Sequence, residues 1–157
     1  MCALRRVEDE RAGPDALGIL IPPARRTFLI LRPRSLSWDL LLLRGPEGST
    51  FREMSHDEAS AAAHAVYRAL RDWAAGGAGR VEAVSLPQGQ GAWLRARVGP
   101  FVLLACARRP GQPYHPLVFA DAHAAGAAAC RLTAILCPPP GVEQEVYFNT
   151  RNFKSPP

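Results

Sequence analysis

The chain has 157 residues, of which 48% are hydrophobic and 21% charged. These values exclude a disordered chain, a collagen-like fibre and a disulfide-dense miniprotein, and they indicate one compact domain. The formal net charge is +5, and the 19 basic residues are 18 arginines and one lysine. Because a GC-rich coding sequence produces the same excess of arginine, alanine, glycine and proline, the positive charge alone does not indicate nucleic-acid binding.

The elements begin after an N-terminal arm. Residues 1–24 mix charges with glycine and proline and show no sustained period, so we expect a partly flexible arm, followed by a single domain at 25–153 and a tail at 154–157. Two apolar runs at 27–31 and 37–44 have the length of strands and predict a hairpin. Residues 49–53 could add a short third strand.

A long helix is expected from about residue 55 to 75. Ser55 and Glu58 have the spacing of a capping box, in which the serine oxygen accepts a free backbone amide and the glutamate reaches back. Apolar residues then recur at intervals of three and four and predict one buried stripe. The stripe comprises Ala59, Ala62, Ala63, Val66, Tyr67, Leu70 and Trp73.

Three strands are expected next, at 80–86, 92–98 and 101–107, joined by glycine-containing turns into an antiparallel meander. The run at 101–107 is apolar at every position, which predicts a central strand. The run at 92–98 alternates, which predicts one face in contact with solvent.

The remaining elements are a short strand at 117–120, a second helix and an edge strand. Asp121 is the expected N-cap of an alanine-rich helix to about residue 132 or further, and residues 142–148 alternate as a solvated edge strand would. The sequence therefore predicts an α+β fold, a single domain whose mostly antiparallel sheet carries both helices.

Four groups of residues could carry function. The first is Trp93, Arg95 and Arg97, which share one face of a strand because strand side chains alternate. An aromatic ring beside two guanidinium groups can stack on a base and neutralise phosphates. The alternative is a tryptophan covered by the N-terminal arm, with solvated arginines beside it.

The second group is a pair of arginine clusters on predicted loops. Arg32 and Arg34 belong to one cluster, and Arg108 and Arg109 form the other. If the two loops met in space, they would make one patch for a phosphate backbone or an acidic partner. Separate surface arginines produced by coding bias are the alternative.

The third group is Cys106 with His115, Asp121 and His123, whose residue types suit a cysteine nucleophile with a base and an orienting acid. A free cysteine in an apolar strand is more commonly an inert core residue. His115 and His123 could also be combined with Cys130 and Cys137, but their spacing matches no common zinc pattern. We therefore expect no metal site and no cofactor.

The C-terminal stretch places aromatic and basic residues near an exposed end, namely Tyr147, Phe148, Arg151 and Phe153. An edge strand there could dock into a partner by strand addition. In the alternative, the aromatic residues pin the tail to the domain.

The sequence is most typical of a small, non-catalytic interaction module that presents an arginine-rich surface to a larger protein partner. Nucleic-acid binding through Trp93 and the arginines is the second hypothesis, and a cysteine-dependent enzyme is the third. The cysteines are widely spaced, and the N-terminal region lacks a run long enough for a signal peptide or a membrane span. We therefore expect a cytoplasmic protein with reduced thiols and no membrane partner. The sequence leaves the oligomeric state open.

Overall fold

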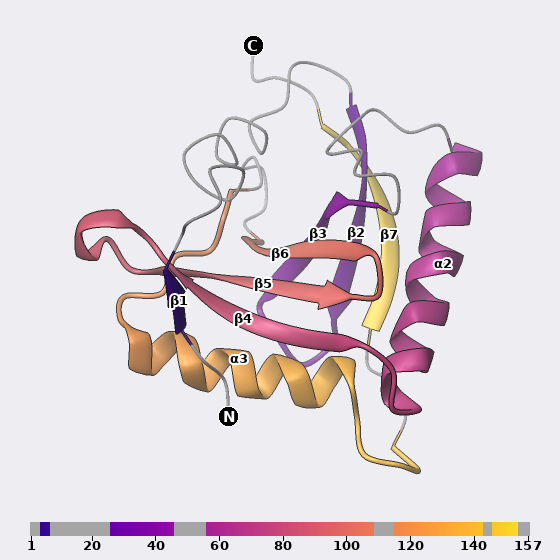
Figure 1. Ribbon diagram of the computed structural model, residues 1–157. Coiled ribbons are helices and arrows are strands. Elements are labelled where there is room, and N and C mark those ends of the chain that lie inside the picture. Colours follow the sequence, from indigo (N-terminus) through magenta and orange to yellow (C-terminus); the bar gives the residue numbers. More distant parts are fainter. Residues whose placement is uncertain (1–3, 7–25, 46–55, 109–114, 143–145, 154–157) are drawn as a thin grey trace.

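The computed structural model describes residues 4–6, 26–45, 56–108, 115–142 and 146–153, and within them the chain forms one sheet and two long helices (Figure 1). The α+β fold expected from the sequence is confirmed. The helices are α2 (His56–Ala74) and α3 (Ala122–Leu136), and a short 3-10 turn, η2, spans Pro87–Gly89. The strands are β1 (Leu4–Arg6), β2 (Arg26–Pro33), β3 (Trp38–Arg44), β4 (Gly79–Ser85), β5 (Ala92–Val98), β6 (Phe101–Ala107) and β7 (Val146–Phe153).

The strand order in the sheet is β1-β4-β5-β6-β3-β2-β7. Strand β1 runs parallel to β4, and the other neighbouring strands are antiparallel. The predicted hairpin is the β2–β3 pair, and the predicted meander is β4–β5–β6. Strand β6 lies in the middle of the sheet, as its continuous apolar run predicts.

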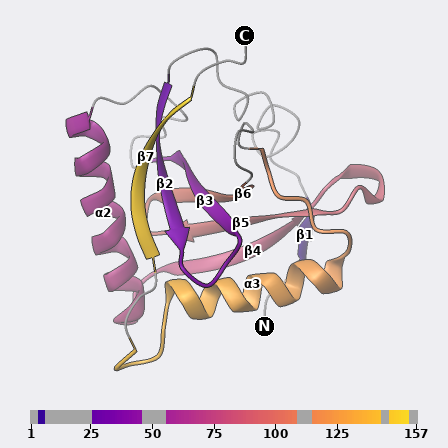
Figure 2. The same cartoon turned by 180° about the vertical axis from the view of Figure 1, so that it is seen from behind.

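Both helices pack on the same face of the sheet, which we call the helix-covered face. Figures 1 and 2 show α3 lying along β4 and α2 lying beside β2 and β7, in agreement with their contacts. The core between helices and sheet contains Leu70 of α2, Leu132 of α3 and Leu103 of β6, each 0% exposed. Burial of such side chains stabilises the domain by roughly 1.5–3 kcal/mol each.

Helix α2 matches its predicted range closely, although Ser55 of the expected capping box lies outside the described residues. The helix ends where Gly76 adopts a φ of +102°, a conformation that favours glycine. Tyr67 is the exception to the predicted buried stripe, because it is 44% exposed. Its ring instead lies beneath the guanidinium of Arg71, 5.9 Å from it.

Helix α3 begins as expected, since the Asp121 side chain accepts a hydrogen bond from the Ala124 amide at 2.8 Å. It continues to Leu136, beyond residue 132. Leu132 and Leu136 are both fully buried, so the apolar spacing that holds the helix on the sheet extends through its last turn.

Other segments differ from their predictions. Three residues of the expected arm form β1, and the strand expected at 117–120 is reduced to two isolated bridges, Ala92 to Phe119 and Cys106 to Pro116. The edge strand predicted at 142–148 is displaced to Val146–Phe153. The third strand predicted at 49–53 lies outside the described residues. No helix in the described residues has the length and hydropathy needed to span a bilayer.

Candidate functional site

The second face of the sheet carries the functional residues predicted on strands. No helix of the described residues packs on it, and we call it the helix-free face. Its side chains alternate with those of the core, because successive strand residues point to opposite faces. They comprise Ile30 and Arg32 of β2, Asp39 and Leu41 of β3, Arg80 and Glu82 of β4, Trp93, Arg95 and Arg97 of β5, and Leu104 and Cys106 of β6.

The middle of the helix-free face is apolar and buried. Ile30, Leu41, Trp93, Leu104 and Cys106 form one cluster, and each is at most 2% exposed. The prediction that this face of β5 contacts solvent is therefore wrong at Trp93. The indole nitrogen, Nε1 of Trp93, has no hydrogen-bond acceptor among the described residues. Because Trp93 is 2% exposed, its ring does not form an open platform for stacking.

A buried carboxylate with three arginines lies at one end of this face. Glu82 is 4% exposed, and its Oε2 accepts hydrogen bonds from Nη2 and Nε of Arg95 at 2.9 and 3.2 Å. The Nε of Arg97 lies 3.4 Å from the same oxygen. The Nε of Arg80 contacts Oε1 at 2.5 Å, a charge contact without the alignment of a hydrogen bond.

The charges around Glu82 determine its protonation. Burial alone would raise the pKa of this carboxyl group, but the hydrogen bond and charge of Arg95 oppose burial, and the charges of Arg80 and Arg97 act in the same direction. Together the arginines hold the pKa below its ordinary value of 4.5. Glu82 is therefore ionised at neutral pH, and among the described residues its negative charge lies beside three guanidinium groups.

A second buried carboxylate lies towards the other end of the face. Asp39 is 0% exposed, and the Nε and Nη2 of Arg32 each lie 3.2 Å from one of its oxygens. Arg108 also binds Asp39, through Nε at 2.8 Å and through Nη2. Among the described residues, two guanidinium groups bind this one carboxylate, and the pairs are partly buried.

One arginine of each predicted cluster binds Asp39, and the first of them, Arg32, lies in strand β2 and not in the predicted loop. Arg32 comes from β2 and Arg108 follows β6, so the carboxylate joins residues far apart in the sequence. Arg34 is exposed in the β2–β3 turn, and Arg109 lies outside the described residues. Sequence reasoning missed Arg80, although the β4–β5 hairpin register places it opposite Arg97.

The cysteine group does not assemble into a catalytic arrangement within the described residues. Cys106 is 0% exposed on the helix-free face, where burial and the charge of Asp39 raise the pKa of its thiol well above the usual range. A protonated, buried thiol is a poor nucleophile. Asp121 caps α3 and His123 lies in its first turn, so both belong to the element on the opposite face of the sheet.

His115 is held near Cys106 by the backbone, because its carbonyl oxygen accepts a hydrogen bond from the Ala107 amide at 2.9 Å. Cys130 is exposed on α3, and Cys137 follows the helix. The described part of the chain contains no group of three His, Cys, Asp or Glu side chains placed to hold a metal ion.

The C-terminal residues predicted to dock a partner are part of the sheet. Tyr147, Phe148, Arg151 and Phe153 belong to β7, whose eight residues pair in register with β2. Strand β7 ends the strand order, so the predicted edge position is confirmed. Docking at this edge stays a prediction.

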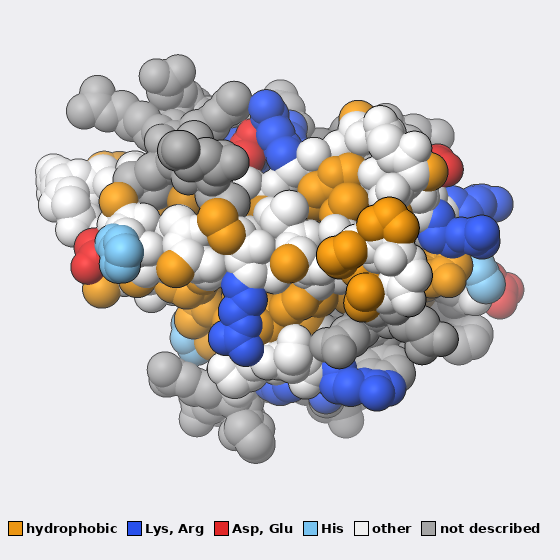
Figure 3. Space-filling view, turned by 90° about the horizontal axis from the view of Figure 1, so that it is seen from below, with side chains coloured by type: hydrophobic (Ala, Val, Ile, Leu, Met, Phe, Trp, Pro, Cys, Tyr) orange, Lys and Arg blue, Asp and Glu red, His pale blue; other side chains and the backbone are white. Residues whose placement is uncertain are grey.

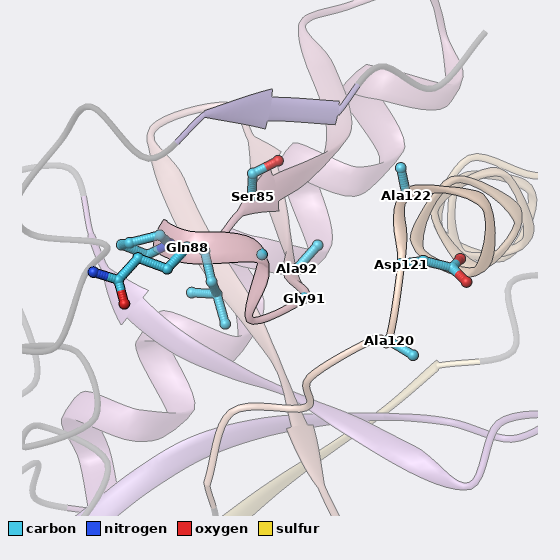
Figure 4. Close-up of a pocket in the computed structure, with 10 residues that line it drawn as sticks. Ser85, Gln88, Gly91, Ala92, Ala120, Asp121 and Ala122 are labelled. Atoms are coloured by element: carbon cyan, nitrogen blue, oxygen red, sulfur yellow. The ribbon is translucent and has the colours of Figure 1, made fainter.

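A cavity of about 730 Å³ lies between the β4–β5 loop and the start of α3 (Figure 4). It is lined by Ser85, Leu86, Pro87, Gln88, Gly89, Gly91, Ala92, Ala120, Asp121 and Ala122. Figure 4 shows the Asp121 carboxylate turned towards α3, where it caps the helix, and away from Gln88. Ser85 and Gln88 contribute only neutral polar groups, so the lining does not define a ligand.

The outer side of α3 is largely apolar. Viewed from below, apolar side chains gather over this helix with few charges between them (Figure 3). Many of its outward positions are alanines, among them Ala124, Ala127 and Ala134. Small side chains of this kind leave the surface without a chemical preference for a ligand.

No protein-family model, curated protein or solved structure matches this chain. Function is therefore inferred from the geometry of the chain itself.

Proposed function

We propose that this protein is a non-catalytic interaction module whose helix-free face binds an acidic surface of a larger protein. The observation that carries the proposal is the charge on that face, where five guanidinium groups from neighbouring segments share two buried carboxylates. At Glu82, the described residues place three guanidinium groups against one carboxylate. An acidic partner would balance the excess and would be attracted from a distance.

The same geometry favours a protein partner over a nucleic acid. Single-stranded nucleic acids bind through aromatic rings on which bases stack, combined with a basic groove. The tryptophan of this face, Trp93, is 2% exposed and cannot stack on a base where it lies. Carboxylates, in contrast, are the ligands that these arginines already hold.

A binding experiment with defined probes tests the proposal. Fluorescence anisotropy would be recorded for labelled deca-glutamate, deca-lysine and a mixed-sequence single-stranded oligonucleotide, each titrated with the protein at several salt concentrations. We expect binding of deca-glutamate that weakens with salt, because exposed charges are screened. We expect no binding of deca-lysine, and weaker binding of the oligonucleotide at equal ionic strength.

Purification from the native cells provides the second measurement. The protein would be isolated at low salt, and absorbance at 260 and 280 nm would be recorded beside the protein bands. A stoichiometric acidic protein that dissociates at high salt supports the proposal. A raised 260 nm signal that is removed by nuclease, or an absence of deca-glutamate binding, contradicts it.

A further inference from the structure

We infer that Arg80 and Arg97 act as a pair that binds Asp or Glu carboxylates of the acidic partner. Arg95, in contrast, stabilises the fold. The inference rests on the proposed function and specifies which arginines of the helix-free face make the contact. It distinguishes residues that share one carboxylate, Glu82, but differ in exposure and in the atoms they have left to donate.

The first step is the position of the pair. Arg80 of β4 lies directly opposite Arg97 of β5 in the antiparallel register. The Cβ atoms of such a pair are about 4.5–5.5 Å apart, and like charges at this distance destabilise a sheet. Glu82 reduces the repulsion but contributes only one negative charge. A bound anion would therefore remove a repulsion that already exists.

The second step concerns the atoms left to donate. Both arginines contact Glu82 through Nε. Within the described residues, the terminal Nη groups of Arg80 and Arg97 donate no hydrogen bond. These two nitrogens form the end of the planar guanidinium fork, whose spacing matches the two oxygens of a carboxylate.

The third step is exposure. The side chain of Arg80 is 51% exposed and that of Arg97 is 36% exposed, whereas that of Arg95 is 11% exposed. Arg95 gives both Nε and Nη2 to Glu82. Arg80 and Arg97 therefore have free donors that solvent can reach, and Arg95 is committed to holding the buried carboxylate.

The face itself indicates a carboxylate as the ligand. Asp39 and Glu82 each sit between guanidinium groups of neighbouring segments, and both are the chain's own carboxylates. A partner's Asp or Glu carboxylate would bind in the same way, by accepting hydrogen bonds from the Nη atoms of Arg80 and Arg97 on the solvent side of Glu82. Each charge-assisted, two-pronged contact is stronger than a neutral hydrogen bond.

Deca-glutamate binding by variants of the full chain tests the inference. The central variant is the double substitution Arg80→Gln with Arg97→Gln, which leaves Arg95 on Glu82. Arg68→Gln is the matched control, since Arg68 is an exposed arginine of α2, on the other side of the sheet. The Lys pair, Arg80→Lys with Arg97→Lys, keeps the charge but loses the fork. Thermal melting of each variant shows whether it is folded.

We expect the Gln pair to bind deca-glutamate about tenfold more weakly than the unmodified protein, because two charge-assisted contacts are lost. The Lys pair should weaken binding by about threefold, and Arg68→Gln by less than about twofold. Glutarate should displace the probe at a lower concentration than inorganic phosphate does.

Three results would overturn the inference while leaving the proposed function in place. The first is a folded Gln pair that binds within twofold of the unmodified protein, which would move the contact to other arginines. The second is a Lys pair that binds as well as the original, and the third is phosphate that displaces the probe before glutarate. Either of these would show that the pair does not select a carboxylate. Absence of deca-glutamate binding by the unmodified protein would instead contradict the proposed function itself.

Discussion

The two faces of the sheet are buried by different means. On the helix-covered face, leucines from α2, α3 and β6 pack against one another, and no charged residue in the described part of the chain is buried there. On the helix-free face, an apolar centre lies between two buried carboxylates, Asp39 and Glu82, each bound by arginines. The first arrangement serves stability alone. The second holds charged groups at a cost in desolvation, which the contacts with the arginines offset.

The largest expected contrast concerns the thiols. Cys106, at the centre of the helix-free face, should react with iodoacetamide more than about a hundredfold more slowly than the exposed Cys130 in the folded protein, because both burial and a raised pKa protect it. Mass spectrometry of the cysteine peptides after timed labelling measures both rates. Equal rates would show that the centre of this face is open, and the comparison between the faces would fail.

Removing a core leucine from the helix-covered face should have the largest effect on stability. Leu103→Ala should lower the free energy of unfolding by about 3 kcal/mol, because Leu103 is 0% exposed and the substitution leaves a cavity. Urea denaturation followed by circular dichroism measures the change. A loss below about 1 kcal/mol would mean that the helices do not pack on the sheet as described.

Glu82→Gln should have a smaller effect and should lower the free energy of unfolding by about 1–2 kcal/mol at neutral pH. The three arginines lose their shared carboxylate but remain partly solvated. The loss should depend on pH. The pKa of Glu82 is lower in the folded protein than in the unfolded chain, so its stabilising contribution is complete above about pH 5 and disappears as the pH falls through the folded pKa. Denaturation between pH 7 and pH 3 should therefore show the two proteins converging in acid. A constant difference would contradict the charge assignment.

The smallest effect is expected for Arg97→Gln, which should change the free energy of unfolding by less than about 0.5 kcal/mol. Arg97 is 36% exposed and its contact with Glu82 is long, at 3.4 Å. Arg95→Gln, by comparison, should lower the free energy of unfolding by about 1 kcal/mol, because Arg95 donates two hydrogen bonds to the buried carboxylate. Thermal or urea denaturation of both variants decides whether these neighbours have separate roles. Equal losses would count against the division between them.

Local signals in the sequence were sufficient for most of the fold. The Asp121 cap, the glycine at the end of α2 and the apolar run of β6 each act within a few residues, and each predicted its element. Strand β1 was missed because its three residues have no pattern of their own and are held by pairing with β4. The exposure of Tyr67 was missed because alanine and tyrosine both fit a helical apolar spacing.

The site was less predictable because its charges meet through tertiary pairing. Alternation along β5 correctly placed Arg95 and Arg97 on one face. The sequence did not identify the carboxylates that bind the arginines. Asp39 lies in a strand that is otherwise apolar, and its partner Arg108 is 69 positions away in the chain. Nor does alternation reveal depth, so the burial of Trp93 could not be foreseen from its strand.

The most direct test of binding on the helix-free face is an NMR titration that follows the side-chain Nε–H signals of the arginines as unlabelled deca-glutamate is added. We predict saturable shifts for Arg80 and Arg97 and unchanged signals for Arg68 on α2. No shift at any arginine, or shifts of equal size at Arg68 and at the pair, would contradict the account.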